Sequence, residues 1–297
     1  MTRDSTQQTA ISTPEPDLDR YAVMGNPISH SLSPRIHQAF AQQTGQAMSY
    51  AAILVARDGF SRALDEFQKT GGRGLNITLP FKHEAWQAVE SRTPRAQQAR
   101  AVNTIAFRAD GKRFGDNTDG AGLVRDILKN HDGHLGSQRI LLLGAGGAVH
   151  GVLGPILEHG PDEVVIANRT KSKAIELAEE FRPWGSLRGC GYSDLAGSRF
   201  DLVINGTSAS LAGEAPPLPD NILSENAWCY DMMYGSKPTP FMHWGSLHGA
   251  AKCLDGLGML VEQAAESFFL WRGVRPDTAL VIRAIKAYLA DHRENTP

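Results

Sequence analysis

The chain has 297 residues, of which 41% are hydrophobic and 21% are charged, so we expect about two domains with sizeable cores. Its formal net charge of -2 at pH 7 provides no general attraction to nucleic acid or to an anionic membrane, and neither is expected as a partner. The three cysteines (Cys190, Cys229 and Cys253) are odd in number and lack C-x-x-C spacing, which argues against a disulfide framework or a metal site and indicates reduced thiols in a cytoplasmic protein.

The first segment of the chain, residues 1–18, is rich in Thr, Gln, Ser and Pro. It lacks the apolar stretch of a signal peptide, and no later segment reaches the ~18 consecutive apolar residues of a membrane-spanning helix. A segment of this composition cannot bury enough apolar surface to offset the entropy lost on ordering. We therefore predict a disordered tail over residues 1–18 and no association with a membrane.

Strand-like and helical patterns alternate from Tyr21 to Arg108. The expected strands are Tyr21–Met24, Tyr50–Val55, Leu75–Leu79 and Asn103–Arg108. The expected helices are Pro34–Gln43, Gly59–Thr70 and Phe81–Val89. Ser33 is predicted to be the N-cap of the first helix, with Pro34 at its first position. This alternation predicts an α/β unit with a mostly parallel sheet.

A second α/β unit begins after Asp119. Its most apolar strand is Gln138–Gly144, and further buried strands are expected at Val164–Ala167, Leu202–Asn205 and Trp228–Asp231. The expected helices are Ala121–Asn130, Lys171–Phe181, Gly258–Trp271 and Pro276–Ala290. Glycines cluster at residues 120–122 and 256–258, where they could serve as hinges between the two units.

A glycine-rich turn follows the most apolar strand directly. The turn is Gly144-Ala145-Gly146-Gly147-Ala148, and a helical pattern follows it. Glycines at such a turn let main-chain N–H groups approach a pyrophosphate at the positive end of the helix. Val149 stands where the third glycine of the usual pattern would be, and glycine also collects in turns that bind nothing. The strand before it and the helix after it nevertheless favour a dinucleotide site.

The end of the next strand indicates which dinucleotide binds. An NAD site would place a carboxylate here to accept from the ribose 2′-hydroxyl, but this chain has Asn168-Arg169-Thr170-Lys171-Ser172-Lys173. Arginine pairs well with a 2′-phosphate. Cations at a helix start also oppose the helix dipole, which suggests that a ligand phosphate compensates them. The alternative is a solvated helix start. We favour NADP, and the missing carboxylate argues against a methyltransferase with a glycine loop.

Four polar segments form candidate substrate contacts. They are residues 29–34 with Ser31 and Ser33, residues 76–82 with Asn76, Thr78 and Lys82, the strand start at Asn103, and residues 116–120 with Asp119. Asn76 and Thr78 should project from the same side of a strand. Each segment also has a plain structural explanation as a cap or a turn. His30 and His37 could act as bases, but we expect them to be capping or core histidines.

Taken together, these motifs closely resemble those of the shikimate dehydrogenase family. The matching segments are SLSPRIH (31–37), NITLPFK (76–82), AVNT (101–104), GDNTDG (115–120), GAGGA (144–148), NRT (168–170), DMMY (231–234) and GLGMLVEQAAESF (256–268). They follow the family order from about Tyr21 to Phe268 and are highly specific as a set. Gln38 departs from the Asn expected after SPxxH. His150 stands where the family often has Arg or Lys, which puts one cofactor phosphate contact in doubt.

The resemblance implies a fold of two domains. An N-terminal α/β substrate domain would comprise residues 19–120 together with the C-terminal helices in residues 257–297. A Rossmann-type, doubly wound NADP domain would occupy residues 121–256 between them. The protein would be a monomer or a homodimer.

The resemblance also implies roles for individual residues. Lys82 and Asp119 would form the catalytic pair and touch the reacting hydroxyl, with no metal involved. Ser31 and Ser33 would hold the substrate carboxylate with Tyr234 nearby. The ring hydroxyls would be bound by Asn76, Thr78, Asn103, Asp119 and Gln263. The cofactor contacts would be Gly144, Ala145, Gly146, Gly147, Ala148, Asn168, Arg169, Thr170 and Lys173, with Met232 and Gly256 near the nicotinamide.

The activity that the resemblance implies is reversible, NADPH-dependent reduction of 3-dehydroshikimate to shikimate, on the route to chorismate and the aromatic amino acids. Lys82 would donate a proton as an ammonium and accept one as an amine. One alternative is a quinate or quinate/shikimate dehydrogenase that can use NAD, with discrimination around Ser31, Ser33 and Tyr234. Another is a non-catalytic sensor of a ring acid or nucleotide, but such a protein could lose Lys82 or Asp119, and this chain retains both.

Overall fold

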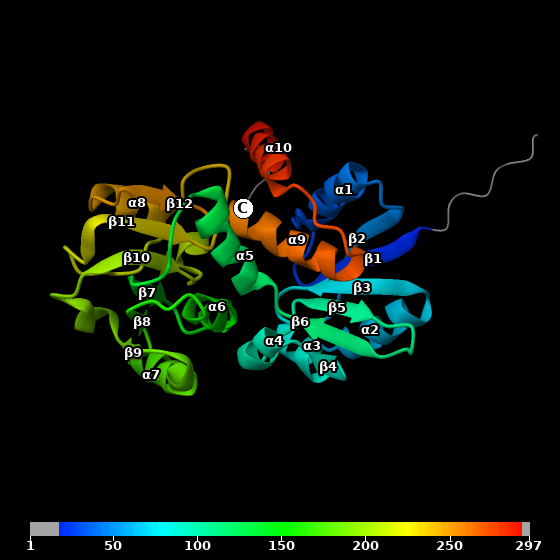
Figure 1. Ribbon diagram of the computed structural model, residues 1–297, viewed down its shortest axis with the longest axis horizontal. Helices are drawn as coiled ribbons and strands as arrows, with labels where there is room; N and C mark the ends of the chain where they lie inside the picture. The colour runs from blue at the N-terminus through cyan, green and yellow to red at the C-terminus, as the bar shows by residue number, and fades with distance from the viewer. Residues whose placement is uncertain (1–17, 293–297) are drawn as a thin grey trace, which may run out of the picture.

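The structure, a computed structural model, describes residues 18–292. The tail predicted for residues 1–18 therefore lies outside the described residues except for Leu18, and so does the end of the expected C-terminal unit, residues 293–297. The described residues form two six-stranded sheets, one in each lobe of an elongated molecule (Figure 1). Helix α9 (Leu257–Arg272) runs between the lobes.

The first lobe contains a mixed sheet with the order β2-β1-β3-β5-β6-β4. Its strands are β1 (Asp19–Gly25), β2 (Met48–Leu54), β3 (Gly72–Ile77), β4 (Ser91–Arg92), β5 (Thr104–Phe107) and β6 (Arg113–Asp116). Its helices are α1 (Ser33–Thr44), α2 (Phe60–Lys69), α3 (Lys82–Gln87) and α4 (Pro94–Ala99). Helix α2 buries Phe60, Leu64 and Phe67 against Leu75 and Ile77 of β3, as expected for apolar residues at helical spacing.

The antiparallel part of this sheet was not predicted from the sequence. β5 runs antiparallel to β3 and to β6, whereas the other strand pairs are parallel. β5 and β6 are joined by a tight turn in which the Arg108 N–H donates to the Lys112 carbonyl over 2.9 Å and Gly111 has a φ of 83°. Asp110-Gly111 is a strong hairpin signal, because such turns need a residue that adopts positive φ.

The second lobe contains a wholly parallel sheet with the order β12-β11-β10-β7-β8-β9. Its strands are β7 (Arg139–Leu143), β8 (Glu163–Ala167), β9 (Leu187–Cys190), β10 (Phe200–Asn205), β11 (Leu223–Asp231) and β12 (Lys252–Leu254). Its helices are α6 (Gly147–Leu157), α7 (Lys171–Phe181) and α8 (Pro240–Leu247). This is the doubly wound order of dinucleotide-binding folds: strands are added in one direction from β7 to β9 and in the other direction from β10 to β12.

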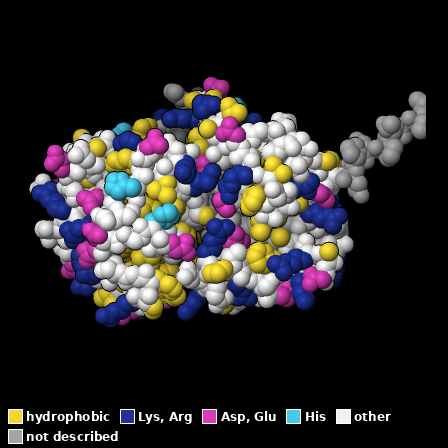
Figure 2. Space-filling model, in the orientation of Figure 1, with side chains coloured by type: hydrophobic (Ala, Val, Ile, Leu, Met, Phe, Trp, Pro, Cys, Tyr) yellow, Lys and Arg dark blue, Asp and Glu magenta, His cyan; other side chains and the backbone are white. Residues whose placement is uncertain are grey.

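The three remaining helices are divided between the lobes. α5 (Asp119–Arg125) continues into the π-helical turn η1 (Asp126–Asn130) and packs Leu123 and Ile127 into the core of the second lobe. α9 and α10 (Thr278–Asp291) instead form a core with Ile36 and Phe40 of α1. The last helices of the chain therefore return to the first lobe. Among residues 18–292, no helix is both long and apolar enough to cross a bilayer. Positive and negative side chains are interspersed over the face shown in Figure 2.

Every strand and helix that the sequence predicts is present, with shifts of a few residues at the ends. The prediction that Ser33 caps α1 is wrong: Leu32 occupies the N-cap, no side chain caps the helix, and Ser33 is the first helical residue. The elements that sequence analysis missed are mostly short: β4, β6, β9, β12, α4 and α8. Such short segments carry too few residues for a periodic pattern to emerge.

Candidate active site

A cavity of about 430 Å³ lies where the two lobes meet. Helices α3, α5 and α9, the ends of β3 and β11, and the segment before α1 all contribute to its wall. The structure brings together eleven of the residues singled out from the sequence: Ser31, Ser33, Asn76, Thr78, Lys82, Asn103, Asp119, Met232, Tyr234, Gly256 and Gln263. Segments from both ends of the chain thus form one site.

Lys82 and Asp119 are in direct contact within this cavity. Lys82 Nζ lies 2.6 Å from Asp119 Oδ2, and the two side chains are 26% and 13% exposed. Lys82 begins α3 and Asp119 begins α5, so each polar group sits at the junction between a loop and a rigid helix. An ammonium held by a carboxylate beside an open cavity is a suitable proton donor for a bound hydroxyl or ketone.

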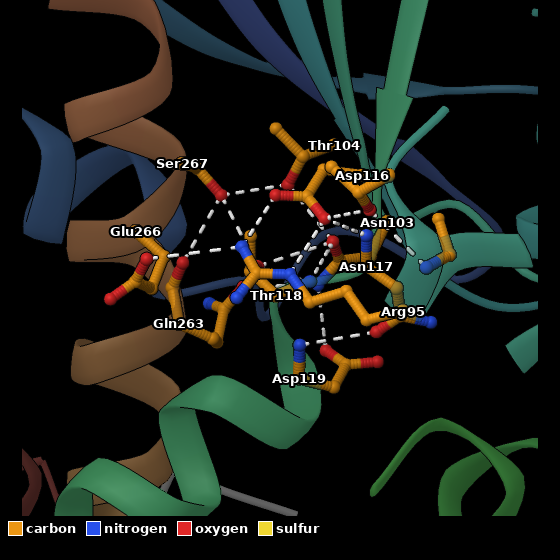
Figure 3. A network of polar contacts seen from close by, with 12 residues as sticks. Arg95, Asn103, Thr104, Asp116, Asn117, Thr118, Asp119, Gln263, Glu266 and Ser267 are labelled. Atoms are coloured by element: carbon orange, nitrogen blue, oxygen red, sulfur yellow. Dashed lines mark hydrogen bonds and ion pairs between the residues drawn. The ribbon is translucent and has the colours of Figure 1, made fainter. Parts of the chain in front are cut away.

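Asn103 is fixed in one amide orientation by its surroundings. The Thr118 main-chain N–H donates to Asn103 Oδ1 over 2.9 Å. Because a main-chain N–H can only donate, the amide nitrogen must face the other way, where Asn103 Nδ2 donates to Asp119 Oδ1 over 2.7 Å. Both oxygens of Asp119 are thereby held, one by Asn103 and one by Lys82. Figure 3 shows Asn103, Thr118 and Asp119 close together at the start of α5.

The side-chain amide of Asn76 is also fixed, but with its oxygen rather than its nitrogen available to the site. Its Nδ2 donates to the Asn103 carbonyl over 3.2 Å and to Ser267 Oγ of α9 over 2.9 Å, so its Oδ1 is left to accept. That oxygen accepts from the hydroxyl of Tyr50 over 2.7 Å. The site can thus present an acceptor at Asn76 and a donor at Asn103 to different hydroxyls of one ligand. Neither Tyr50 nor Ser267 is predicted as a site residue from the sequence, because each lies within an otherwise ordinary strand or helix.

His37 packs against the ring of Tyr50. The two rings stack with centroids 4.2 Å apart and planes 6° apart. His37 is fully buried, and that burial lowers its pKa to about 3, so the imidazole is neutral at physiological pH. The prediction of a capping or core histidine is confirmed for His37, which lies in the core. It is wrong for His30, which is exposed, lines the cavity and does not cap α1.

A buried ion pair braces the turn that leads to Asp119. Asp116 is 3% exposed and accepts from Arg95 Nε over 2.7 Å and from the hydroxyl of Thr93 over 2.6 Å (Figure 3). Arg95 Nη2 reaches the second Asp116 oxygen at 2.5 Å, which completes a forked pair. The pair ties α4 to the end of β6, and this restricts the position of the turn at residues 117–119.

The remaining wall carries hydroxyl groups. Ser31 Oγ accepts from the Ser33 main-chain N–H over 3.3 Å, so the two serines lie close together at the start of α1. Tyr234 enters from the loop after β11, and its burial raises the pKa of the phenol, which keeps the hydroxyl protonated as a donor. Hydroxyl groups that line one cavity in this way can donate hydrogen bonds to a carboxylate.

The glycine turn lies outside this cavity, at the carboxyl end of β7. Gly144 has a φ of 107°, a conformation that L side chains rarely adopt, and Gly146, Gly147 and Ala148 are exposed. A side chain added at Gly146 or Gly147 would meet open space. Asn168, Arg169, Thr170 and Lys173 lie at the end of the neighbouring strand β8 and the start of α7. The turn and these residues border the crevice where a doubly wound sheet binds nucleotides.

The cations at the start of α7 differ in whether an acidic side chain of the protein pairs with them. Lys171 Nζ lies 2.8 Å from Asp194, so its charge is met within the protein. Within residues 18–292, no ion pair involves Arg169 or Lys173. Lys171 therefore needs no ligand phosphate to compensate its charge at the start of the helix. His150 Nε2 lies 3.4 Å from Glu180 of α7, and the imidazole packs edge-on against Phe181.

Three family models match successive parts of the chain. The shikimate dehydrogenase substrate binding domain matches residues 23–105, the shikimate / quinate 5-dehydrogenase model matches residues 126–212, and the shikimate 5'-dehydrogenase C-terminal domain matches residues 256–286. Together they span both lobes and the returning helices.

Curated relatives and solved structures agree with these models. Shikimate dehydrogenase (NADP(+)) of Nitrosococcus oceani is 56% identical over 90% of this chain and 95% of its own length. The enzyme of the same name from Alkalilimnicola ehrlichii is 58% identical over 90% and 98%. Shikimate 5-dehydrogenase of Thermus thermophilus, solved with NADP(H) and shikimate, is 34% identical with a TM-score of 0.81 over 92% of this chain and 100% of its own. The Ael1 enzyme of Pseudomonas putida is 47% identical with a TM-score of 0.84 over 90% and 97%.

Proposed function

The chain belongs to the shikimate dehydrogenase family, and from this premise we propose that it catalyses the reversible, NADPH-dependent reduction of 3-dehydroshikimate to shikimate. The observation that carries the proposal is the contact of 2.6 Å between Lys82 Nζ and Asp119 Oδ2 in a cavity lined by hydroxyl and amide groups. Reduction of a ketone requires a proton source beside the carbonyl oxygen, and this pair supplies one.

Shikimate has one carboxylate and several ring hydroxyls, and the cavity has groups suited to each. We assign the carboxylate to Ser31 and Ser33, with Tyr234 nearby, because their hydroxyl groups can all donate. The ring hydroxyls are assigned to Asn76, Thr78, Asn103, Asp119 and Gln263. The fixed amides of Asn76 and Asn103 distinguish an acceptor position from a donor position, which orients the ring.

Lys82 transfers the proton. In the reductive direction its ammonium protonates the oxygen that develops negative charge, and in the oxidative direction its amine removes the proton from the hydroxyl. Asp119 holds the ammonium toward the cavity and accepts from the same substrate hydroxyl. Asn103 anchors the other oxygen of Asp119 and so prevents the carboxylate from turning away.

The residues of the second lobe fit NADP. The exposed glycine turn leaves space for a pyrophosphate at the start of α6, and Arg169 and Lys173 offer charge to a 2′-phosphate. We assign Gly144, Ala145, Gly146, Gly147, Ala148, Asn168, Arg169, Thr170 and Lys173 to NADP, with Met232 and Gly256 near the nicotinamide. When bound, the cofactor supplies the hydride.

The domain limits follow from this assignment. We propose residues 19–120 and 257–297 as the substrate domain and residues 121–256 as the NADP domain. Packing of Leu123 and Ile127 into the second lobe, and of α9 and α10 against α1, supports these limits. We further propose that the enzyme acts in the cytoplasm, in chorismate biosynthesis, as a monomer or homodimer.

The test is the absorbance of NADPH during turnover. The purified protein is mixed with NADP and shikimate. In parallel reactions, quinate replaces shikimate or NAD replaces NADP. We expect NADPH to form with shikimate at least tenfold faster than with quinate, and NAD to be the poorer cofactor. Equal rates with quinate would identify a quinate/shikimate dehydrogenase, and no reaction with any pair would contradict the proposal.

Replacement of Arg169 by alanine should discriminate between the two cofactors. NADP loses a hydrogen bond between two charged groups, worth roughly 1.5–3 kcal/mol, so its KM should rise about tenfold to a hundredfold while that of NAD stays within about twofold. Initial rates at varied cofactor concentration measure both. Lys171→Ala is the matched control, because Lys171 is a cation on the same helix start that already pairs with Asp194. An equal rise in the KM for NADP and for NAD would show that Arg169 does not bind the 2′-phosphate.

A further inference from the structure

Asp231 is a fully buried carboxylate that the assigned mechanism does not use. It is the last residue of β11, and Met232, Met233 and Tyr234 directly after it line the cavity. Burial raises the pKa of Asp231, and the hydrogen bonds that it accepts oppose this shift. A buried charge is costly unless it is well satisfied, so the partners of this group define what it holds in place.

Among the described residues, four groups donate to Asp231, two to each oxygen. Oδ1 accepts from Asn205 Nδ2 and from the Met233 main-chain N–H, each over 3.1 Å. Oδ2 accepts from Ser210 Oγ over 2.7 Å and from Thr239 Oγ1 over 2.6 Å. A carboxylate accepts at both oxygens and donates at neither, which suits this arrangement.

One set of these bonds fixes the loop that follows β11. The loop leaves the sheet at Met233, whose N–H is held by Asp231, and returns at Thr239, whose hydroxyl is held by the same carboxylate. Thr239 also caps α8 by accepting from the Met242 N–H over 3.2 Å. Both ends of the loop that carries Met232 and Tyr234 are thus held by hydrogen bonds to the Asp231 carboxylate.

The other set fixes the loop that follows β10. Asn205 ends that strand, and its Oδ1 accepts from the Thr207 N–H over 3.1 Å and from the Thr207 hydroxyl over 2.7 Å. Ser210 lies in the short helix η4 (Ala209–Ala212) of the same loop. Thr207 and Gly206 pack against the glycine turn, because a Cβ at Gly144 would come within 3.2 Å of Thr207 Cγ2 and 3.3 Å of the Gly206 carbonyl.

We propose that Asp231 is a positioning residue that sets the two loops bordering the nicotinamide side of the site relative to each other. One loop carries the Tyr234 contact to the substrate and the Met232 contact to the cofactor, and the other supports the glycine turn. This inference rests on the proposed function, because the ligands of both loops are those assigned above. Asp231 itself is fully buried and does not line the cavity.

Asp231→Asn tests the proposal with almost no change in volume. An amide accepts at one atom only, and its NH2 group must face two of the four donors, so the two loops lose their common anchor. We expect the KM for shikimate and the dissociation constant of NADPH each to rise roughly fivefold to tenfold, with kcat reduced no more than about threefold. Initial rates give the KM and kcat values, and quenching of NADPH fluorescence gives the dissociation constant.

Asp201→Asn is the matched control. Asp201 lies at the opposite end of the same sheet, where its Oδ2 accepts from the Arg139 N–H over 2.9 Å. Its replacement should leave both constants at the wild-type value even if the melting temperature falls. If Asp231→Asn lowers the melting temperature without changing either constant, Asp231 is purely structural and the proposal is overturned.

A second variant, Ser210→Ala, decides the matter if Asp231→Asn does not fold. It removes one of the four bonds, so the dissociation constant of NADPH should rise about twofold to threefold, and a wild-type value would overturn the proposal. The two proposals can fail separately. A wild-type protein without turnover on shikimate contradicts the proposed function, whereas normal wild-type turnover with unaltered variants contradicts only the role of Asp231.

Discussion

Replacement of Lys82 by alanine is expected to lower kcat by about a hundredfold or more, while the KM for shikimate stays within a few-fold of the wild-type value. The reason is that the proton passes to the substrate only in the transition state, whereas the ring is held by other groups in the ground state. Steady-state rates at saturating NADP, with shikimate varied, measure both parameters.

Lys82→Arg is the informative companion variant. Arginine keeps the positive charge beside Asp119 but cannot be deprotonated in a protein, so it cannot act as proton donor and acceptor. We expect kcat to remain at least about tenfold below the wild-type value. If the arginine variant is fully active, Lys82 supplies charge rather than a proton. A rise in KM alone for Lys82→Ala would make Lys82 a binding residue and place the base elsewhere.

Replacement of Asp119 by alanine is expected to reduce kcat by about a hundredfold and also to raise the KM for shikimate by roughly tenfold. The structure gives the reason for the double effect. Asp119 Oδ2 holds Lys82, and Asp119 Oδ1 accepts from Asn103, so its loss releases both the proposed proton donor and an amide that we assign to substrate binding. Asp119→Asn keeps the volume of the side chain but removes its charge. Its kcat and its KM for shikimate should lie between those of the wild type and those of the alanine variant.

The double variant Lys82→Ala/Asp119→Ala shows whether the two residues act as a unit. Residues that depend on each other lose far less together than the product of their separate losses. We therefore expect kcat of the double variant to lie within about tenfold of that of Lys82→Ala. Losses that multiply would show that Asp119 acts on the substrate independently of Lys82.

The sequence predicts the framework of this molecule well for a physical reason. Fully buried strands such as β7 read as continuous apolar runs, and the glycine turn that follows it is marked by composition alone. The hairpin between β5 and β6 was missed although Asp110-Gly111 signals it. The capping role given to Ser33 is wrong because the pattern S-P does not specify whether the serine precedes the helix or begins it.

Features that depend on distant segments could not be predicted. The orientation of the Asn103 amide is set by the main chain of Thr118, and that of Asn76 by the carbonyl of Asn103. Likewise, nothing near Lys171 in the sequence reveals that Asp194 neutralises it. The residue types of the candidate site can thus be chosen from motifs, but which atom of each faces the ligand is decided by the tertiary fold.

The return of α9 and α10 to the first lobe has a consequence for biosynthesis. The second lobe is continuous in the chain, so it can fold as a unit while the ribosome is still translating. The first lobe cannot, because Ile36 and Phe40 of α1 are covered by Val261 and Phe268, which are translated only after the second lobe. Until then Ile36 and Phe40 lack the side chains that cover them, and transiently exposed apolar surface of this kind favours aggregation. A messenger truncated before α9 yields a polypeptide with neither a complete first lobe nor Gln263 in its cavity.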